Sequence, residues 1–303
     1  MSQPAPSDLD SIEAVQQGLL RLNYVAGRGL ATAVFLSLRL GKPLFLEGEA
    51  GVGKTEVAKV LASLLDARLI RLQCYEGLDV HNAVYEWAYP RQILHLRMLE
   101  ASGAARAEME RDLYDRQFLI ARPLLQAIGP ADGPPPVLLI DEIDRADEEF
   151  ESYLLELLSD FQITIPEIGT IRAERPPAVV ITSNRTREVH DALKRRCLYY
   201  WIDYPSFETE YQIVLLKAPG VPAALAAQIT RVAQALREQD LFKPPGVAET
   251  LDWATALLAL DRTDVDEATL TDTLGVLLKY QDDVQRVQGA LARDLARRAH
   301  GAG

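Results

Sequence analysis

Residues 48–55 read GEAGVGKT and match the phosphate-loop pattern G-x-x-x-x-G-K-[ST]. An apolar run at 43–46 precedes them, and a segment with helical spacing follows at 57–65. The alternative is a glycine-rich turn that matches the pattern by chance, but such a turn would not need a strand before it and a helix after it. Glycines let backbone N–H groups surround phosphate oxygens, while Lys54 would contact the β and γ phosphates and Thr55 would ligate magnesium. The predicted nucleotide-binding residues are Gly48, Glu49, Ala50, Gly51, Val52, Gly53, Lys54, Thr55 and Glu56.

A pair of carboxylates, Asp141 and Glu142, directly follows the apolar run 137–140. Side chains at the carboxyl end of a buried strand face the ligand crevice of an open α/β sheet. Asp141 would act with Thr55 at the magnesium ion, and Glu142 would polarise the attacking water. The alternative is a pair of solvated carboxylates at the start of the next helix.

Two further polar sites follow apolar or helical segments. The strand-like run 179–184 ends in Asn184, which would orient water or contact the γ phosphate, unless it only caps a turn. A basic cluster at 194–196 precedes the run 198–202. Arg196 would reach the γ phosphate of an adjacent subunit as an arginine finger; alternatively, the cluster complements a helix dipole.

The elements that must position these residues alternate along the chain. Strands are predicted at 43–46, 68–73, 137–140, 178–182 and 198–202, with helices at 11–18, 29–40 and 57–65 and helical segments between the later strands. Such alternation predicts an α/β fold with a parallel sheet covered on both faces. Beyond residue 205 the pattern is helical only. We therefore expect a flexible tail at 1–10, a nucleotide-binding domain at 11–205 and a helical domain at 206–303.

Charge, apolar stretches and cysteine content argue against several classes of protein. The chain of 303 residues carries a formal charge of −12, which argues against sequence-independent nucleic-acid binding because that needs a cationic face. The longest clean apolar stretch, at 31–38, is too short for a membrane span, and the N-terminus lacks the features of a signal peptide. The two cysteines form neither a disulfide framework nor a metal cluster. These features predict a cytoplasmic protein.

The ordered set GEAGVGKT, VLLIDEID, VVITSN and ALKRRCLYYWIDYP resembles the AAA+ ATPases, and most closely their MoxR branch. The resemblance implies a P-loop NTPase αβα core with a five-stranded parallel sheet, a small all-helical lid domain, and ATP and Mg²⁺ as cofactors. By matching motif, Lys54 and Thr55 correspond to Walker A, Asp141 and Glu142 to Walker B, Asn184 to sensor 1, and Arg196 to the arginine finger, with Arg195 as the alternative. Tyr24 and Val25 stand where such proteins line the adenine pocket.

Two inserts support the MoxR branch: a hairpin before sensor 1 at about 161–173 and a helix-2 insert at about 85–118. Within the latter, 91–114 is expected to be helical. We interpret its apolar residues as ordinary packing rather than as a client-binding surface; they are Ile93, Leu94, Leu96, Met98 and Leu99. The lid departs from the family pattern, because 246–253 lacks a sensor 2 arginine and has Thr250 near that place, so sensor 2 is absent or Lys243 or Arg231 substitutes.

The resemblance implies a homo-oligomeric ring, most simply a hexamer, that remodels a client protein. MoxR proteins are thought to act in metalloenzyme maturation beside a partner with a von Willebrand factor A domain; a molybdenum-containing carbon monoxide dehydrogenase is one example of a client. Two alternatives remain. A nucleic-acid-stimulated motor is disfavoured by the acidic charge, and a non-hydrolysing nucleotide-gated binding module is disfavoured by Glu142.

Overall fold

The computed structural model describes residues 9–103, 112–130 and 133–301. Most of the expected N-terminal tail and the middle of the expected helix-2 insert therefore lie outside the described residues. Contacts divide the chain into two units. The first contains Arg28–Glu47, Ala58–Tyr200 and the residues before Gln16; the second contains Gln16–Gly27, Gly48–Val57 and Trp201–Gly303.

A five-stranded parallel sheet forms the centre of the α/β fold, as predicted. Its strand order is β2-β5-β8-β1-β9, so β2 is an edge strand. The strands are β1 (Leu44–Gly48), β2 (Leu69–Gln73), β5 (Val137–Asp141), β8 (Ala178–Ser183) and β9 (Leu198–Ile202). Every residue of β1 and β5 is buried, which explains why these strands read as continuous apolar runs rather than alternating ones.

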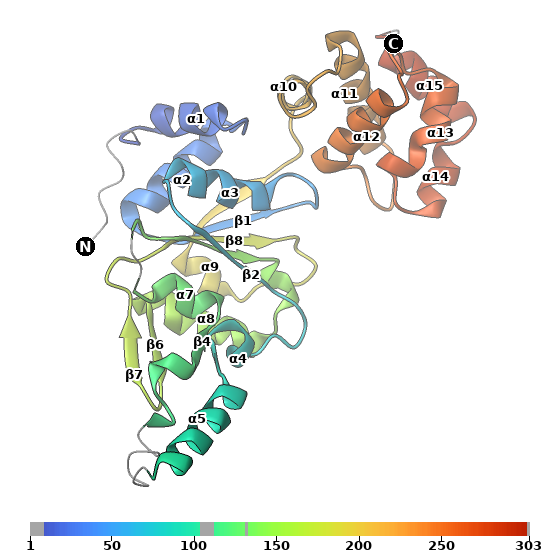
Figure 1. Cartoon of the computed structure of the whole chain (residues 1–303). Helices are drawn as coiled ribbons and strands as arrows, with labels where there is room; N and C mark the ends of the chain where they lie inside the picture. The colour runs from blue at the N-terminus through green and yellow to red at the C-terminus, as the bar shows by residue number, and fades with distance from the viewer. Residues whose placement is uncertain (1–8, 104–111, 131–132, 302–303) are drawn as a thin grey trace. The chain divides into compact units, whose positions relative to one another are not determined.

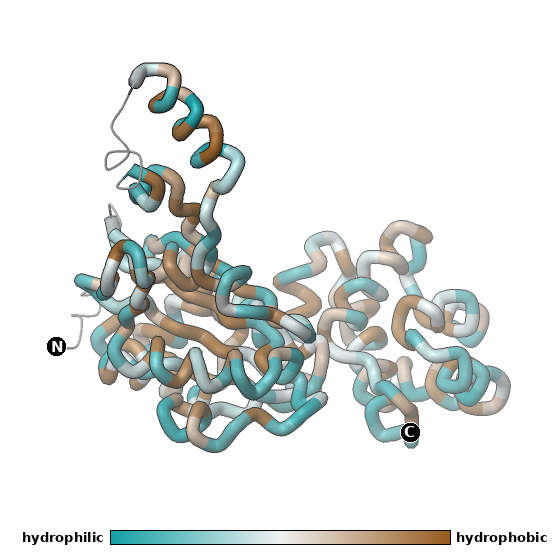
Figure 2. Tube along the Cα trace, turned by 90° about the horizontal axis from the view of Figure 1, so that it is seen from below, coloured by the Kyte–Doolittle hydropathy of each residue, from teal (hydrophilic) through white to brown (hydrophobic). Residues whose placement is uncertain are grey.

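Helices cover both faces of this sheet (Figure 1). On one face, Phe45, Leu138 and Ile140 belong to a single apolar cluster with α7 (Pro123–Ile128), α8 (Glu148–Asp160) and Leu193 of α9 (Asp191–Arg196). The other face is covered by α2 (Arg28–Leu40) and α3 (Lys54–Leu64). Figure 2 shows the sheet as an apolar layer between more polar elements.

Two small antiparallel sheets carry the inserts. The hairpin of β6 (Gln162–Ile165) and β7 (Gly169–Arg172) occupies the place expected for it. The helix-2 region contains α4 (Val80–Ala83), β3 (Tyr85–Trp87), α5 (Tyr89–Ser102), η1 (Arg116–Phe118) and β4 (Leu119–Ala121), with β3 paired to β4.

The insert helix α5 differs from the sequence prediction in two respects. It ends at Ser102 instead of continuing towards residue 114, because Gly103 adopts a left-handed C-cap (φ 76°). Residues 104–111 of the predicted helix are not described. In addition, Ile93, Leu94 and Met98 are 55%, 61% and 64% exposed, so the interpretation as ordinary packing is wrong for these three. Figure 1 shows that α5, which carries these residues, projects from the rest of the first unit.

The pattern changes from strands to helices between Ile202 and Phe207, as expected. The C-terminal helices are α10 (Phe207–Lys217), α11 (Ala223–Arg237), α12 (Val247–Ala259), α13 (Glu267–Leu277), α14 (Gln281–Val287) and α15 (Ala290–Ala299). They enclose their own core around the fully buried Trp253. The second unit also contains most of α1 (Ile12–Arg21). In the part of the chain that the structure describes, no helix is long and apolar enough to cross a membrane.

Candidate nucleotide-binding site

The glycines of the phosphate loop are required by backbone geometry. Gly51 and Gly53 have φ of 78° and 92°, a conformation that residues with a Cβ adopt only with strain. Gly48 ends β1, and a Cβ there would lie 2.2 Å from the main-chain oxygen of Ile202. The backbone therefore favours glycine at these three positions for physical reasons, and the amide groups of such a glycine-rich loop can surround phosphate oxygens.

Lys54 is the first residue of α3 and folds back across the loop. Its Nζ donates hydrogen bonds to the main-chain oxygens of Gly48 (2.8 Å) and Glu49 (2.6 Å), and the side chain is buried. The ammonium is thus fixed against its own loop at the N-terminus of a helix, where the helix dipole also favours anions. Glu56, in the same turn, pairs with Lys217 of α10 at 2.9 Å.

Other segments of the second unit contact the loop. The amide of Ala248 in α12 donates to the main-chain oxygen of Gly51 (3.1 Å). A Cβ on Gly53 would lie 3.9 Å from the ring of Tyr24, and both Tyr24 and Val25 are half-buried. The segment predicted to line an adenine pocket therefore does lie beside the phosphate loop.

Asp141 ends β5 in the first unit, and its side chain is only 3% exposed. Oδ1 accepts a hydrogen bond from the Thr182 hydroxyl (2.5 Å). Oδ2 accepts from Nε (3.0 Å) and Nη2 (2.6 Å) of Arg71 on the neighbouring strand β2. A buried carboxylate requires such compensation, because burial without partners would disfavour its charged form.

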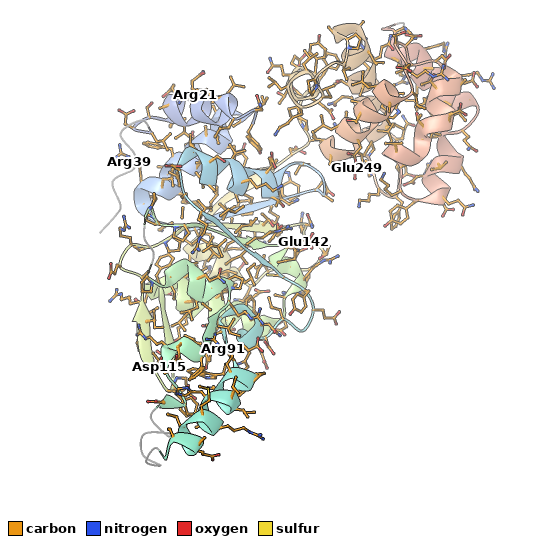
Figure 3. All side chains as sticks on the ribbon, viewed as in Figure 1. Arg21, Arg39, Arg91, Asp115, Glu142 and Glu249 are labelled. Atoms are coloured by element: carbon orange, nitrogen blue, oxygen red, sulfur yellow. The ribbon has the colours of Figure 1, made fainter. Side chains whose placement is uncertain are left out.

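Glu142 follows at the end of the same strand, where Figure 3 labels it. Its backbone is left-handed (φ 56°, ψ 52°), which is strained for a residue with a side chain. The Thr182 hydroxyl that donates to Asp141 also accepts the Glu142 amide proton (2.9 Å), so one hydroxyl joins both acidic residues. The Glu142 carboxylate pairs with Arg145 of η2 (Ile143–Arg145) at 3.2 Å, and both groups are partly exposed.

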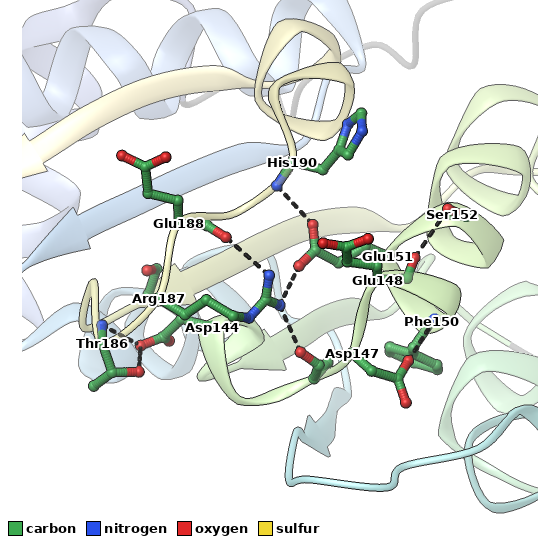
Figure 4. Close-up of polar contacts among 12 residues, drawn as sticks. Asp144, Asp147, Glu148, Phe150, Glu151, Ser152, Thr186, Arg187, Glu188 and His190 are labelled. Carbon is green, nitrogen blue, oxygen red and sulfur yellow. Dashed lines mark hydrogen bonds and ion pairs between the residues drawn. The ribbon is translucent and has the colours of Figure 1, made fainter.

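The loop that carries Asn184 is held by Asp144. The buried Asp144 carboxylate accepts hydrogen bonds from the amides of Asn184 (3.1 Å) and Thr186 (2.9 Å) and from the Thr186 hydroxyl (2.6 Å). Burial alone would raise the pKa of Asp144, but these hydrogen bonds outweigh it and the pKa is lowered. Figure 4 shows Asp144 and Thr186 in this contact.

A second buried carboxylate fixes the other end of that loop. Glu151 of α8 accepts from the guanidinium of Arg187 and from the amide of His190 (2.7 Å), and Arg187 also donates to the main-chain oxygen of Ala146 (2.5 Å) (Figure 4). Asp144 and Arg187 also line a surface cavity of about 660 Å³; its other lining residues are Glu76, Arg145, Ala146, Asp147 and Glu148.

The three basic residues of α9 differ in their contacts. Arg195 is 82% exposed and pairs loosely with Asp191 (3.5 Å). Arg196 is exposed but donates to the main-chain oxygen of Leu155 in α8 (2.7 Å). Neighbouring Lys194 contacts the buried Glu47 of β1 (3.3 Å). The helix that carries both finger candidates is therefore tied to the strand that leads into the phosphate loop.

Two of the three sensor 2 candidates, Thr250 and Arg231, form hydrogen bonds within the C-terminal helices. The Thr250 hydroxyl donates to Glu210 (2.9 Å), which also pairs with the buried Arg237 (2.6 Å). Arg231 donates to the main-chain oxygen of Ala299 (2.8 Å), whereas Lys243 is exposed. Thr250 is thus part of a buried ion-pair network of the lid.

The two predicted magnesium ligands, Thr55 and Asp141, both carry oxygen donors. Mg²⁺ prefers oxygen ligands and uses one or two carboxylates together with substrate phosphates. Thr55 in the second unit has a hydroxyl and Asp141 in the first unit has a buried carboxylate, so each residue by itself is of a type that would fit such an ion. Among the described residues there is no cluster of three or more His, Cys, Asp or Glu side chains that would hold a metal without such phosphates.

Sequence reasoning missed Arg71, Thr182 and Asp144. The polar ending of the run 178–184 was a signal for Thr182, and the pattern Asp141-Glu142-Ile143-Asp144 was one for Asp144. Arg71 gave no signal, because its contact with Asp141 depends on the pairing of β2 with β5. Burial, and next the Asp141 charge, raise the pKa of Cys74 to about 12, which disfavours the reactive thiolate form at this position.

Comparison with known proteins identifies the class. A family model described as AAA domain (dynein-related subfamily) matches residues 43–197, half of the chain, and the chain belongs to this family of AAA+ ATPases. The match spans the phosphate loop, the acidic pair, Asn184 and the basic cluster.

Solved structures with a similar fold include RuvB from Thermotoga maritima. A proline-to-glycine mutant of RuvB is 18% identical, with 93% of this chain and 76% of that chain covered and a TM-score of 0.49. The structure described as the RuvB Holliday junction branch migration motor is 18% identical, with 90% and 72% covered and a TM-score of 0.46. Among curated proteins, the search found no match.

Proposed function

We propose that this chain is a MoxR-type ATPase that hydrolyses ATP with Mg²⁺ in order to remodel a client protein. Membership of the AAA family supports nucleotide chemistry in general. The observation that carries the step to hydrolysis is the single Thr182 hydroxyl that fixes both Asp141 and Glu142 at the end of β5. A binding module would not need the strained backbone of Glu142.

In this proposal each residue has a role set by its chemistry. Lys54 neutralises the β and γ phosphates, and Glu142 accepts a proton from the attacking water after leaving Arg145. Magnesium, when bound with the nucleotide, supplies further neutralisation of phosphate charge. Asn184 orients the water, and its loop is held by Asp144.

We propose that the active form is a homo-oligomeric ring, most simply a hexamer, in which Arg196 acts on the nucleotide of the adjacent subunit. Its hydrogen bond to Leu155 is to a main-chain oxygen and can be exchanged for a phosphate. Arg195, whose side chain is 82% exposed, is the alternative finger if the motif alignment slips by one residue.

The proposed client is a protein rather than a nucleic acid. The chain is acidic overall, and α5 exposes Ile93, Leu94 and Met98 on a projecting helix. Exposed apolar side chains of this kind suit a protein partner better than a polyanion. The resemblance to the MoxR branch further suggests a metalloenzyme client, such as a molybdenum-containing carbon monoxide dehydrogenase, and a von Willebrand factor A partner.

The substitution Glu142→Gln tests the catalytic assignment. It preserves the size of the side chain but removes the base, so we expect nucleotide affinity within about twofold of wild type and turnover reduced at least about a hundredfold. Binding of a fluorescent ATP analogue and release of phosphate measure the two quantities. Wild-type turnover in this variant would show that Glu142 is not the base.

A mixing experiment tests the shared active site. Arg196→Ala and Glu142→Gln subunits, each inactive alone, are combined at several ratios. If Arg196 acts on the adjacent subunit, some interfaces in mixed rings carry both intact groups and phosphate release returns. Absence of recovery at every ratio, with mixed assembly verified, would contradict action across the interface.

Stimulation of wild-type turnover by DNA or RNA would contradict the protein-client part of the proposal.

A further inference from the structure

Arg71 is the feature of the site that the proposed function leaves unused. It lies on the edge strand β2, and its guanidinium forms two hydrogen bonds to Oδ2 of Asp141, from Nε at 3.0 Å and from Nη2 at 2.6 Å. The pair is asymmetric: the Asp141 side chain is 3% exposed and that of Arg71 is 51% exposed. One partner is therefore fixed and the other reaches water.

Because Arg71 is exposed and Asp141 is buried, the guanidinium beside Asp141 can be exchanged for another cation. A buried carboxylate without a cation is costly, so Asp141 needs positive charge beside it whether or not a metal is present. An arginine with half of its side chain in solvent can leave at modest cost, because its charge is rehydrated as it moves out. Asp141 cannot move in the same way, since Thr182 also holds it.

Arg71 has a second side-chain acceptor besides Asp141. Nη2 of Arg71 also donates to Oε1 of Gln73 at 2.5 Å. Residues two apart on a strand share a face, so Gln73 can keep this hydrogen bond while Arg71 turns away from Asp141. A guanidinium that leaves Asp141 would therefore retain Gln73 as a hydrogen-bond partner.

We propose that Arg71 is a positioning residue that acts as the resident cation of Asp141 and yields this place when magnesium enters with the nucleotide. The inference rests on the proposed function, because it assigns Asp141 to the magnesium site. Arg71 then stabilises Asp141 in the nucleotide-free protein and lowers the benefit of magnesium, since the metal has to displace an existing partner.

The test compares dissociation constants of N-methylanthraniloyl-ADP in excess EDTA and in saturating Mg²⁺, using the full chain. The ratio of the two constants measures the contribution of magnesium. In Arg71→Gln this guanidinium no longer has to be displaced, so we expect the ratio to rise about tenfold over wild type, with most of the change in the Mg²⁺ arm. Arg71→Lys, which keeps the charge, should stay near the wild-type ratio.

Two further variants make the result specific. Arg68→Gln removes the same charge just before the same strand, but Arg68 contacts the main-chain oxygen of Gln126 instead of Asp141, and its ratio should remain that of wild type. In the Asp141→Asn background, adding Arg71→Gln should change the ratio less than about twofold.

The outcomes separate this inference from the proposed function. If the wild type binds the nucleotide in neither condition, the proposed function fails. If it binds but Arg71→Gln leaves the ratio unchanged or lowers it, Arg71 is not exchanged for magnesium and the inference is overturned. A merely structural role would weaken binding equally in EDTA and in Mg²⁺, which also overturns it.

Discussion

The Thr182 hydroxyl is the smallest group on which the proposed chemistry depends. It donates to Asp141 and accepts from the Glu142 amide, and it is buried. Thr182→Val keeps the shape of the side chain but removes both hydrogen bonds and leaves a partly buried amide unsatisfied. We expect turnover to fall at least about tenfold, while nucleotide affinity changes less than about threefold. Phosphate release and fluorescent nucleotide binding measure this difference.

Thr182→Ser is the matched control, because it retains the hydroxyl and loses only a methyl group. Its turnover should stay within about threefold of wild type. Equal turnover in the valine and serine variants would show that the hydroxyl does not position the acidic pair.

Asp144 gives a prediction about pH. Its pKa is lowered from the ordinary value of 3.8 in the folded protein, so the ionised form stabilises the fold fully above that value. This stability is lost as the pH falls below 3.8 and through the folded pKa. Asp144→Asn should therefore lower the free energy of unfolding by about 2 kcal/mol at neutral pH, and the deficit should shrink in acid. Urea unfolding at about pH 7 and about pH 3 measures it.

Asp66→Asn is the control for this experiment. Asp66 is exposed and left-handed (φ 48°), a conformation that asparagine accepts equally well. Its unfolding should match that of wild type at both pH values. A deficit for Asp144→Asn that persists unchanged in acid would mean that the charge of Asp144 does not hold the Asn184 loop.

Among single residues, the sequence predicted those that form motifs but not those that form hydrogen bonds to the motif residues from other strands. The phosphate loop and the acidic pair have fixed spacing along the chain, and a single strand or turn presents them. Arg71 and Thr182 act from two other strands, so their contacts depend on sheet order. That order, β2-β5-β8, is set by long-range packing and not by any local pattern.

Among the elements, the strands β1, β5 and β8 were predictable because burial on both faces makes most of their residues apolar. The insert helix α5 was not. Of its fourteen residues only Gln92 is buried, where it donates to the main-chain oxygen of Leu113 (2.6 Å). Helical spacing of apolar residues normally indicates a face packed on the core, yet here Ile93, Leu94 and Met98 are exposed.

The exposure of α5 can be tested through stability. Leu94→Gln and Met98→Gln replace exposed apolar side chains, so each should change the free energy of unfolding by less than about 0.5 kcal/mol. Leu154→Ala, at a fully buried position of α8, should cost about 2–5 kcal/mol in the same denaturation experiment. A cost above about 2 kcal/mol for either glutamine variant would restore the packing interpretation.

At the scale of the whole molecule, contacts between residues place the phosphate loop in the same unit as the C-terminal helices. Most of the central sheet belongs to the other unit. The hydrogen bond from Ala248 to Gly51 and the ion pair of Lys217 with Glu56 carry this grouping. A nucleotide that rearranges the loop is therefore expected to act on α10 and α12 directly. Sequence patterns gave the change from strands to helices, but not this grouping, which depends on tertiary contacts.

Binding of ATP with Mg²⁺ to the purified chain is the measurement on which the account depends most directly. Isothermal titration calorimetry should give a dissociation constant of about 1 mM or tighter for the wild type and at least about tenfold weaker binding for Lys54→Ala, which removes the cation held against Gly48 and Glu49. Equal affinity in both proteins, or no binding of any adenine or guanine nucleotide by the wild type, would contradict the assignment of residues 48–55 as the nucleotide site.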